Sequence, residues 1–145
     1  MFKHILVATD GTALAKEAED KGIGLAKSLG AKVSFLTVRM PFYVYTLEAS
    51  GLAEMSGQYD EKSKSAAKTI LTRAEASAAA AGVHCDTFDV ESEYPYEAIN
   101  KAATDHGCDL IVMASHGRRG VAALLLGSET VKVLTHTSIP VLVCR

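Results

Sequence analysis

The sequence contains little cysteine and no long apolar run. Its three cysteines, Cys85, Cys108 and Cys144, form no Cys-x-x-Cys pair and have no histidine at metal-ligand spacing, so neither a disulfide framework nor a zinc site is indicated. No stretch reaches the roughly 18 apolar residues that a membrane span requires. The N-terminal apolar run meets Thr9 and Asp10 too early to be a signal peptide. We therefore expect a cytoplasmic protein with no membrane partner.

An excess of charge of one sign is absent as well. The 145 residues include 15 Lys and Arg against 17 Asp and Glu, and 48% of them are hydrophobic. These proportions are those of an ordinary globular protein rather than of a disordered or fibrous chain. The basic residues are scattered among acidic ones, so we expect no nucleic-acid partner. The length suits one domain, residues 1–145.

Two common nucleotide-binding motifs are also missing. The chain has no G-x-x-x-x-G-K-[ST], which excludes a P-loop NTPase, and no G-x-G-x-x-G after its first apolar run, which argues against a dinucleotide redox domain. The stretch Gly22-Ile-Gly24-Leu-Ala-Lys27-Ser28 resembles part of a phosphate loop. It lies inside a predicted helix and lacks both spacings, so we do not expect it to bind phosphate.

Short apolar runs alternate with segments of helical period along the chain. The predicted strands are residues 3–8, 32–38, 84–90, 109–113 and 139–144. In four segments the apolar residues repeat at helical spacing, with Gly or Pro near the ends. We predict helices at 13–29, at 59–81, from Pro95 until the stop at Gly107, and at 128–135. Between Met40 and Tyr59 there is no clear period, and we expect a long loop of the kind that is usually functional or mobile.

This alternation predicts an α/β fold in one doubly wound, Rossmann-like domain. Each parallel pair of strands needs a right-handed crossover, which places helices on both faces of the sheet. We expect five parallel strands in the order 3-2-1-4-5, whose switch point lies between the first and fourth strands. The loops at 9–12 and 114–130 follow those two strands, so a ligand is expected between them.

Glycines and hydroxyls follow the fourth predicted strand. Gly117 and Gly127 are separated by nine residues, and Gly127-Ser128 begins the last predicted helix. Glycine allows the backbone to approach a ligand closely, and the first N–H groups of a helix attract a phosphate. Arg118 and Arg119 add positive charge nearby. The alternative is an ordinary helix start in which Ser128 is the capping residue.

Two other polar side chains near this segment have open roles. Asp10 ends the first predicted strand, where its carboxylate suits a ribose hydroxyl or Mg²⁺ beside phosphates, and equally suits a helix cap. His116 lies in the glycine segment, but no serine or cysteine nucleophile can be paired with it from the sequence. A histidine on a surface loop is the simpler interpretation, and we expect no metal site made of histidines.

Three segments carry a resemblance that covers the whole chain. They are Ala8-Thr9-Asp10, then Ser115-His116-Gly117 followed after nine residues by Gly127-Ser128, and the closing Ile139-Pro140-Val141-Leu142-Val143. Together they resemble the universal stress protein family, whose nucleotide-binding branch carries G-x-x-G-x9-G-[ST]. Gly117, Gly127 and Ser128 supply the last three elements of that pattern, whereas Ala114 replaces its first glycine.

The resemblance implies a regulatory protein of the stress response that binds ATP, with Mg²⁺, as a homodimer. It places Ala8, Thr9, Asp10 and Val38 beside the adenine and ribose, with Asp10 also the candidate metal ligand, and Met113 and Ala114 at the end of the fourth strand. Gly117, Gly127, Ser128, Glu129 and Thr130 would contact the phosphates through backbone N–H and hydroxyl groups. The protein that such a regulator would act on is not indicated.

The strand predicted at 139–144 offers a physical reason for the homodimer. No predicted helix follows it, so its edge can pair with the same strand of a second copy. A monomer with a protected edge is the alternative.

Two other functions stay open at this point. A slow ATPase would need a base that orients water, for which only Asp10, His116 and Glu129 are candidates. A dimeric interaction module of the family's other branch, which binds no nucleotide, is favoured by Ala114 and opposed by the intact Gly117 and Gly127-Ser128.

Overall fold

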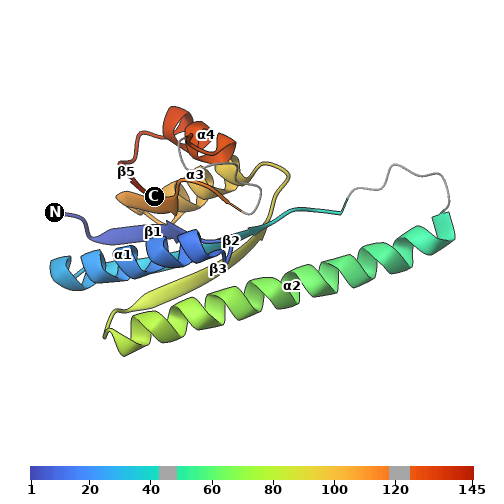
Figure 1. Ribbon diagram of the computed structural model, residues 1–145, viewed down its shortest axis with the longest axis horizontal. Coiled ribbons are helices and arrows are strands. Elements are labelled where there is room, and N and C mark those ends of the chain that lie inside the picture. The colour runs from blue at the N-terminus through green and yellow to red at the C-terminus, as the bar shows by residue number, and fades with distance from the viewer. Residues whose placement is uncertain (43–48, 118–124) are drawn as a thin grey trace.

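Five parallel strands form a single sheet at the centre of the fold (Figure 1). The computed structural model describes residues 1–42, 49–117 and 125–145, with residues 49–53 described as backbone only. The strands are β1 (His4–Ala8), β2 (Lys32–Arg39), β3 (Cys85–Glu91), β4 (Leu110–Ala114) and β5 (Val141–Cys144). They are ordered β3-β2-β1-β4-β5, so the predicted α/β class and the strand order 3-2-1-4-5 are confirmed.

Helices cover both faces of the sheet, as predicted. They are α1 (Ala13–Leu29), α2 (Ala49–Ala80), α3 (Pro95–Asp105) and α4 (Ser128–His136). α1 and α2 pack on the face formed by Ile5, Val7, Val33, Phe35, Leu110 and Val112. α3 and α4 pack on the opposite face, formed by Leu6, Leu36, Ile111 and Met113. Successive strand residues point to opposite faces, so a sheet covered on both faces requires unbroken apolar runs like those in the sequence.

The glycine-rich stretch at residues 22–28 lies inside α1, where Gly22 has a packing role. A β-carbon on Gly22 would lie 2.6 Å from Cγ2 of Val7, so the glycine lets α1 approach β1 closely. This contact accounts for the glycine without a ligand.

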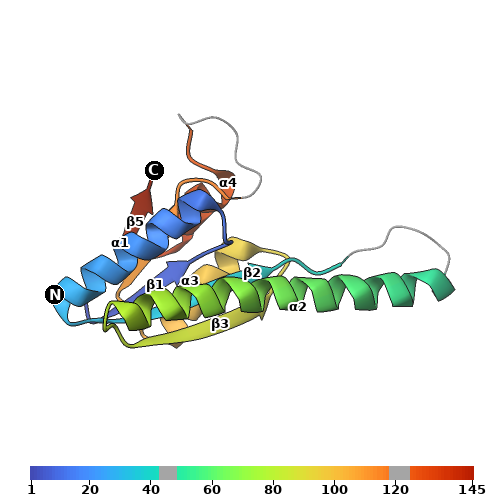
Figure 2. The same ribbon diagram turned by 60° about the horizontal axis from the view of Figure 1, so that its bottom comes forward.

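The long loop predicted between Met40 and Tyr59 is largely wrong, because α2 begins at Ala49. Residues 43–48 lie outside the described part of the chain. The first half of α2 extends well beyond the sheet, so no core selects an apolar stripe there, and its glycines further weaken the helical pattern (Figures 1 and 2). Adding residues to an existing helix is favourable, so the helix continues outward without that stripe.

Polar contacts hold the outer half of α2 to the sheet. Arg39, at the end of β2, lies 3.4 Å from Asp60, and the Tyr59 hydroxyl donates to the carbonyl of Met40 at 3.0 Å. Within the described ranges, no helix combines the length and apolar content needed to cross a membrane.

Candidate functional site

The carboxyl ends of β1 and β4 lie side by side because these two strands pair directly. The turn after β1, residues 9–12, therefore meets the segment after β4, residues 115–117. A β-carbon on Gly117 would lie only 3.0 Å from Oδ2 of Asp10. The two segments thus converge at the switch point, which is where ligands bind in open parallel sheets.

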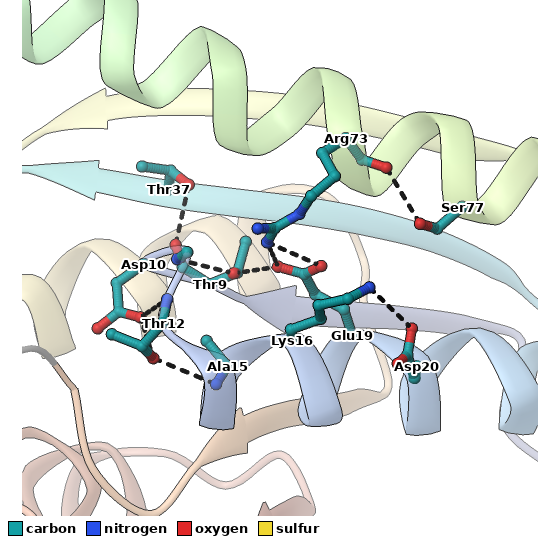
Figure 3. Close-up of polar contacts among 11 residues, drawn as sticks. Thr9, Asp10, Thr12, Ala15, Lys16, Glu19, Asp20, Thr37, Arg73 and Ser77 are labelled. Carbon is teal, nitrogen blue, oxygen red and sulfur yellow. Dashed lines mark hydrogen bonds and ion pairs between the residues drawn. The ribbon is translucent and has the colours of Figure 1, made fainter.

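Asp10 organises this turn through Thr12. Oδ1 of Asp10 accepts hydrogen bonds from the backbone N–H and the hydroxyl of Thr12, at 3.0 and 2.7 Å (Figure 3). The Thr12 hydroxyl oxygen accepts from the N–H of Ala15 at 3.2 Å and so caps α1. The helix cap that the sequence left open for Asp10 therefore belongs to Thr12, and Asp10 orients it.

Gly11 brings α2 against the same turn. Its φ of +78° lies in the left-handed region that favours glycine. A β-carbon at this position would also lie 2.7 Å from Cγ1 of Ile70 on α2. A residue with a side chain would therefore be both strained and crowded here.

A cavity of about 320 Å³ opens beside the turn. Its lining consists of Asp10, Gly11 and Thr12 from the turn and of Ala66, Thr69 and Ile70 from α2. This volume lies near the lower end of the range typical of small-molecule sites. One wall of the region beside Asp10 is therefore formed by α2. No sequence pattern connected this part of the chain with the site.

Thr9 faces inward rather than toward this cavity. Its side chain is buried, its N–H donates to the carbonyl of Leu36 at 2.9 Å, and its carbonyl accepts from the hydroxyl of Thr37 at 2.9 Å. Its own hydroxyl donates to the buried carboxylate of Glu19, which is also paired with Arg73 (Figure 3). Thr9 therefore anchors the turn to β2 and α1.

The N-terminus of α4 forms the other side of the site. Gly127 is the N-cap residue of α4, and because it has no side chain it makes no side-chain capping hydrogen bond. Its N–H donates to the carbonyl of Ser115 at 2.7 Å. A β-carbon on Gly127 would lie 2.9 Å from that same carbonyl oxygen. Ser128 is the first helical residue and is exposed, so it is not the cap that the alternative interpretation required.

The side chains of Glu129 and Thr130 have partners within the protein. Oε2 of Glu129 accepts from the N–H of Tyr96 at 3.0 Å, in the first turn of α3. The buried Thr130 hydroxyl lies 3.1 and 3.2 Å from the carbonyl oxygens of Ala114 and Ser115. In this structure these residues can therefore offer a ligand their backbone N–H groups rather than their side chains.

The remaining predicted site residues lie at the ends of the central strands. Ala8 ends β1, Val38 is next to the end of β2, and Met113 and Ala114 end β4. Ala8, Val38 and Met113 belong to the apolar cluster under α3 and α4. Arg118 and Arg119, which the sequence placed near the phosphates, lie outside the described residues.

Arg39, beside Val38, is committed to carboxylates. Its guanidinium lies 2.5 Å from Asp89, 3.2 Å from Glu91 and 3.4 Å from Asp60. Burial lowers the pKa of this guanidinium, but the hydrogen bond and charge of Asp89 outweigh burial, and the net pKa is raised. Arg39 therefore stays charged and serves to join β2, β3 and α2.

His116 has a serine neighbour, but the pair does not form a catalytic arrangement. Nδ1 of His116 lies 3.0 Å from Oγ of Ser115. Ser115 is only 3% exposed, so its hydroxyl is not presented to a substrate. Among the described residues, no group of three or more His, Cys, Asp or Glu side chains could hold a metal ion.

Sequence reasoning missed Thr12, Glu19 and Arg73. The one available signal was Glu19, a charged residue on the face of α1 that otherwise carries small and apolar residues. The inward-facing residues of that face are Ala15, Ala18, Gly22, Ile23 and Ala26.

Comparison with known proteins gives consistent matches along the whole chain. A model of the universal stress protein family matches residues 1–145. The universal stress protein YxiE of Bacillus subtilis is 32% identical over 149 residues, covering 100% of both chains. The structure of UspA from Lactobacillus plantarum superposes with a TM-score of 0.84 at 22% identity, covering 99% of this chain and 97% of the other. The structure of a universal stress protein in complex with cAMP has a TM-score of 0.73 at 25% identity, again covering 99% and 97%.

Proposed function

The chain belongs to the universal stress protein family, and from that membership and its site geometry we propose that it is an adenine-nucleotide-binding regulatory protein of the stress response. ATP is the nucleotide that we expect, as the resemblance to the nucleotide-binding branch implies. The observation that carries the proposal is the N-terminus of α4, where a β-carbon on Gly127 would lie 2.9 Å from the carbonyl oxygen of Ser115 and the N-cap residue makes no side-chain capping hydrogen bond.

The first turn of α4 suits phosphate oxygens. The N–H groups of residues 128–130 have no acceptors within the helix, and the helix dipole adds a partial positive charge at this end. Phosphate oxygens would accept hydrogen bonds from these groups. Because the side chains of Glu129 and Thr130 are engaged elsewhere, we assign their contribution to the backbone.

Asp10 suits the ribose and the metal that would accompany the phosphates. It lies across from Gly117, so it faces the segment that leads toward α4. Mg²⁺ usually keeps several waters and binds one or two carboxylates together with phosphate oxygens. A single carboxylate is therefore an adequate protein ligand when the nucleotide supplies the rest. Bound Mg²⁺ would offset phosphate charge, while Ala8, Thr9 and Val38 would shape the nucleoside side of the site.

A relative of known structure supports the class of ligand. The universal stress protein solved in complex with cAMP has the same fold over almost the whole chain. Its ligand contains the adenine, ribose and phosphate groups for which we propose sites here. That likeness favours an adenine nucleotide over other phosphorylated ligands.

We propose binding without rapid turnover. Hydrolysis needs a base that orients water within hydrogen-bond reach. Of the three candidates, Glu129 holds the first turn of α3 and Asp10 orients Thr12. His116 is paired with the buried Ser115. The site is thus better suited to holding a nucleotide than to cleaving it.

The alternative function, an interaction module that binds no nucleotide, is favoured only by Ala114. This residue is the last of β4 and still pairs with Cys144 of β5. Strand residues have negative φ, which alanine adopts as readily as other residues with side chains. The alanine therefore causes no backbone strain, and we prefer nucleotide binding.

We also propose a homodimer formed through β5. This strand is the edge of the sheet beside β4. Leu142 of β5 is 40% exposed, as is Leu134 of α4. Pairing of two β5 edges about a two-fold axis would satisfy their backbone groups and cover part of this apolar surface.

Equilibrium dialysis with ATP tests the proposed ligand. We expect saturable binding by the wild-type protein and its loss in Gly127→Val, whose side chain would press on the Ser115 carbonyl 2.9 Å from the β-carbon. Gly24→Val is the matched control, because nothing lies within 4 Å of a β-carbon at Gly24. Thermal unfolding without ATP shows whether each variant is folded. Equal binding by Gly127→Val and wild type, or no saturable binding by wild type, would exclude this assignment.

A further inference from the structure

A buried carboxylate lies behind the turn of the site, and the proposed function does not use it. Glu19, in the middle of α1, is 1% exposed. Removing an ionised carboxylate from water is costly unless it is paired and hydrogen-bonded. The partners of Glu19 should therefore indicate why this position carries a charge.

Arg73 of α2 is the first partner. Its Nη2 lies 3.0 Å from Oε1 and 3.3 Å from Oε2 of Glu19. The Arg73 side chain is 40% exposed, so the guanidinium reaches from the surface down to the buried carboxylate. The ion pair therefore joins α1 to α2 beneath the surface (Figure 3).

Thr9 is the second partner. Its hydroxyl donates to Oε1 of Glu19 and accepts from the backbone N–H of Gly11 at 3.3 Å. The carboxylate thus fixes the direction of the hydroxyl that receives the Gly11 N–H. Thr9 and Gly11 flank Asp10, so this short chain of hydrogen bonds ends in the turn that we assign to the ribose and metal.

The same ion pair also fixes the wall of the cavity. Ile70 lies one helical turn before Arg73, lines the cavity and packs against Gly11. A shift of α2 along or around its axis would break the Arg73–Glu19 contact and move Ile70 off the turn. The ion pair therefore sets the position of α2 relative to Asp10.

Packing alone does not require charges here. The other inward-facing residues of α1 are small or apolar, and replacing a buried ion pair with apolar residues of similar volume is often neutral or stabilising. We propose that Glu19 and Arg73 are positioning residues of the nucleotide site, which hold Thr9 and the 9–12 turn in place and tie that turn to α2. This inference rests on the proposed function for its ligand.

Coupling of this kind is reciprocal. If docking of α2 stabilises the conformation of the turn that binds nucleotide, a bound nucleotide stabilises the docking of α2 by the same factor. The outer half of α2 extends beyond the sheet, so a change in how α2 docks would move an exposed part of the molecule (Figure 2). The chain from Arg73 to Thr9 thus connects the site with the most extended element of the fold.

The double variant Glu19→Leu/Arg73→Leu separates positioning from stability. It removes both charges together and retains apolar bulk, so we expect a folded protein whose urea midpoint is lowered only by the loss of the acceptor of the Thr9 hydroxyl. We expect ATP to bind about tenfold more weakly, because the binding free energy lost is roughly that of one hydrogen bond, which orders the turn before ATP binds. Amide hydrogen exchange at Gly11 should become several-fold faster, because the Thr9 hydroxyl is no longer held.

Two further variants complete the experiment. Thr9→Val keeps the shape of the side chain but removes the hydroxyl, and should weaken ATP binding to a similar extent even if the double variant does not fold. Lys16→Leu/Asp20→Leu removes an exposed pair 3.9 Å apart on the same helix and should change neither affinity nor exchange at Gly11.

Wild-type affinity and wild-type Gly11 exchange in Thr9→Val and in a folded double variant would overturn the inference. If wild type binds no ATP, the proposed function fails, and the exchange of Gly11 still decides whether these residues position the turn.

Discussion

The hydroxyl of Thr130 lies 3.1 Å from the carbonyl oxygen of Ala114, and this contact fastens the first turn of α4 to the end of β4. The hydroxyl is buried and is shared with the carbonyl of Ser115 at 3.2 Å. The proposed phosphate site depends on the position of that helix turn. Thr130 therefore contributes to the site by placing the backbone N–H groups around it.

Replacement of Thr130 by valine should destabilise the protein by about 1–2 kcal/mol, because it removes a buried donor and leaves its acceptors with fewer partners. Urea unfolding measures this change, and dialysis with ATP should show weaker binding. Thr135→Val is the matched control, since Thr135 is exposed and its hydroxyl bonds to residues of its own helix. Similar losses in the two variants would show that the Thr130 contact has no special role.

Gly22 offers a second prediction, about the core rather than the site. A β-carbon there would lie 2.6 Å from Cγ2 of Val7, so Gly22→Ala should destabilise the protein by about 1–3 kcal/mol through overpacking. Gly24→Ala, on the exposed side of the same helix, should instead stabilise it by about 0.5–1 kcal/mol. Urea unfolding measures both changes. Addition of Val7→Ala should recover part of the loss in Gly22→Ala, and absence of any recovery would argue against the assigned contact.

Much of the fold could be predicted from the sequence. Unbroken apolar runs such as residues 109–113 predict strands covered on both faces, and the helix predicted at 13–29 ends at Leu29, before Gly30. The start of α2 could not be predicted in this way, because apolar residues repeat at helical spacing where a helix packs against a core. The first turns of α2 extend beyond the sheet (Figure 1), and the large apolar side chains described there, Met55 and Tyr59, are exposed.

The candidate site was predictable only in outline. Strand order places Asp10 near Gly117, and their proximity is found. The contact between Glu19 and Arg73 joins positions 54 residues apart, and no local pattern pairs them. The direction of a hydroxyl such as that of Thr130 likewise depends on packing between elements. Sequence patterns therefore predicted which segments meet at the candidate site but not the contacts that hold those segments together.

The protonation of His4 should make stability depend on pH. His4 is 6% exposed, its Nε2 lies 2.7 Å from Oγ of Ser34, and burial together with the charge of Lys32 lowers its pKa below 6.5. The folded protein therefore binds fewer protons at this site than the unfolded chain. The resulting stability is fully present above pH 6.5 and is lost as the pH falls from there through the lowered pKa, with a slope of at most about 1.4 kcal/mol per pH unit.

Urea unfolding between pH 7.5 and pH 5, a range chosen to bracket the ordinary histidine pKa of about 6.5, measures this slope. His4→Gln keeps a hydrogen-bonding group for Ser34 without the titration, and its stability should vary less with pH than that of wild type. Asp109 accepts from the N–H groups of Lys3 and His4. Burial raises the pKa of Asp109, but those backbone hydrogen bonds outweigh it and lower the net pKa below 3.8. Its contribution is therefore lost only at more acidic pH. An unchanged slope in His4→Gln would show that another group is responsible.

The proposed dimer leads to a prediction at the edge of the sheet. Leu142 lies in β5 and is 40% exposed, and a second copy paired along β5 would bury it or bring it near its own symmetry mate. Leu142→Arg should place like charges close together across that axis and disfavour association. Light scattering after gel filtration should then give half the wild-type mass. Met55→Arg is the control, since Met55 is an exposed apolar residue on the outer half of α2. A dimer that persists in Leu142→Arg would place the interface elsewhere, and a monomeric wild type would remove the dimer from the proposal while leaving the nucleotide site to be tested by itself.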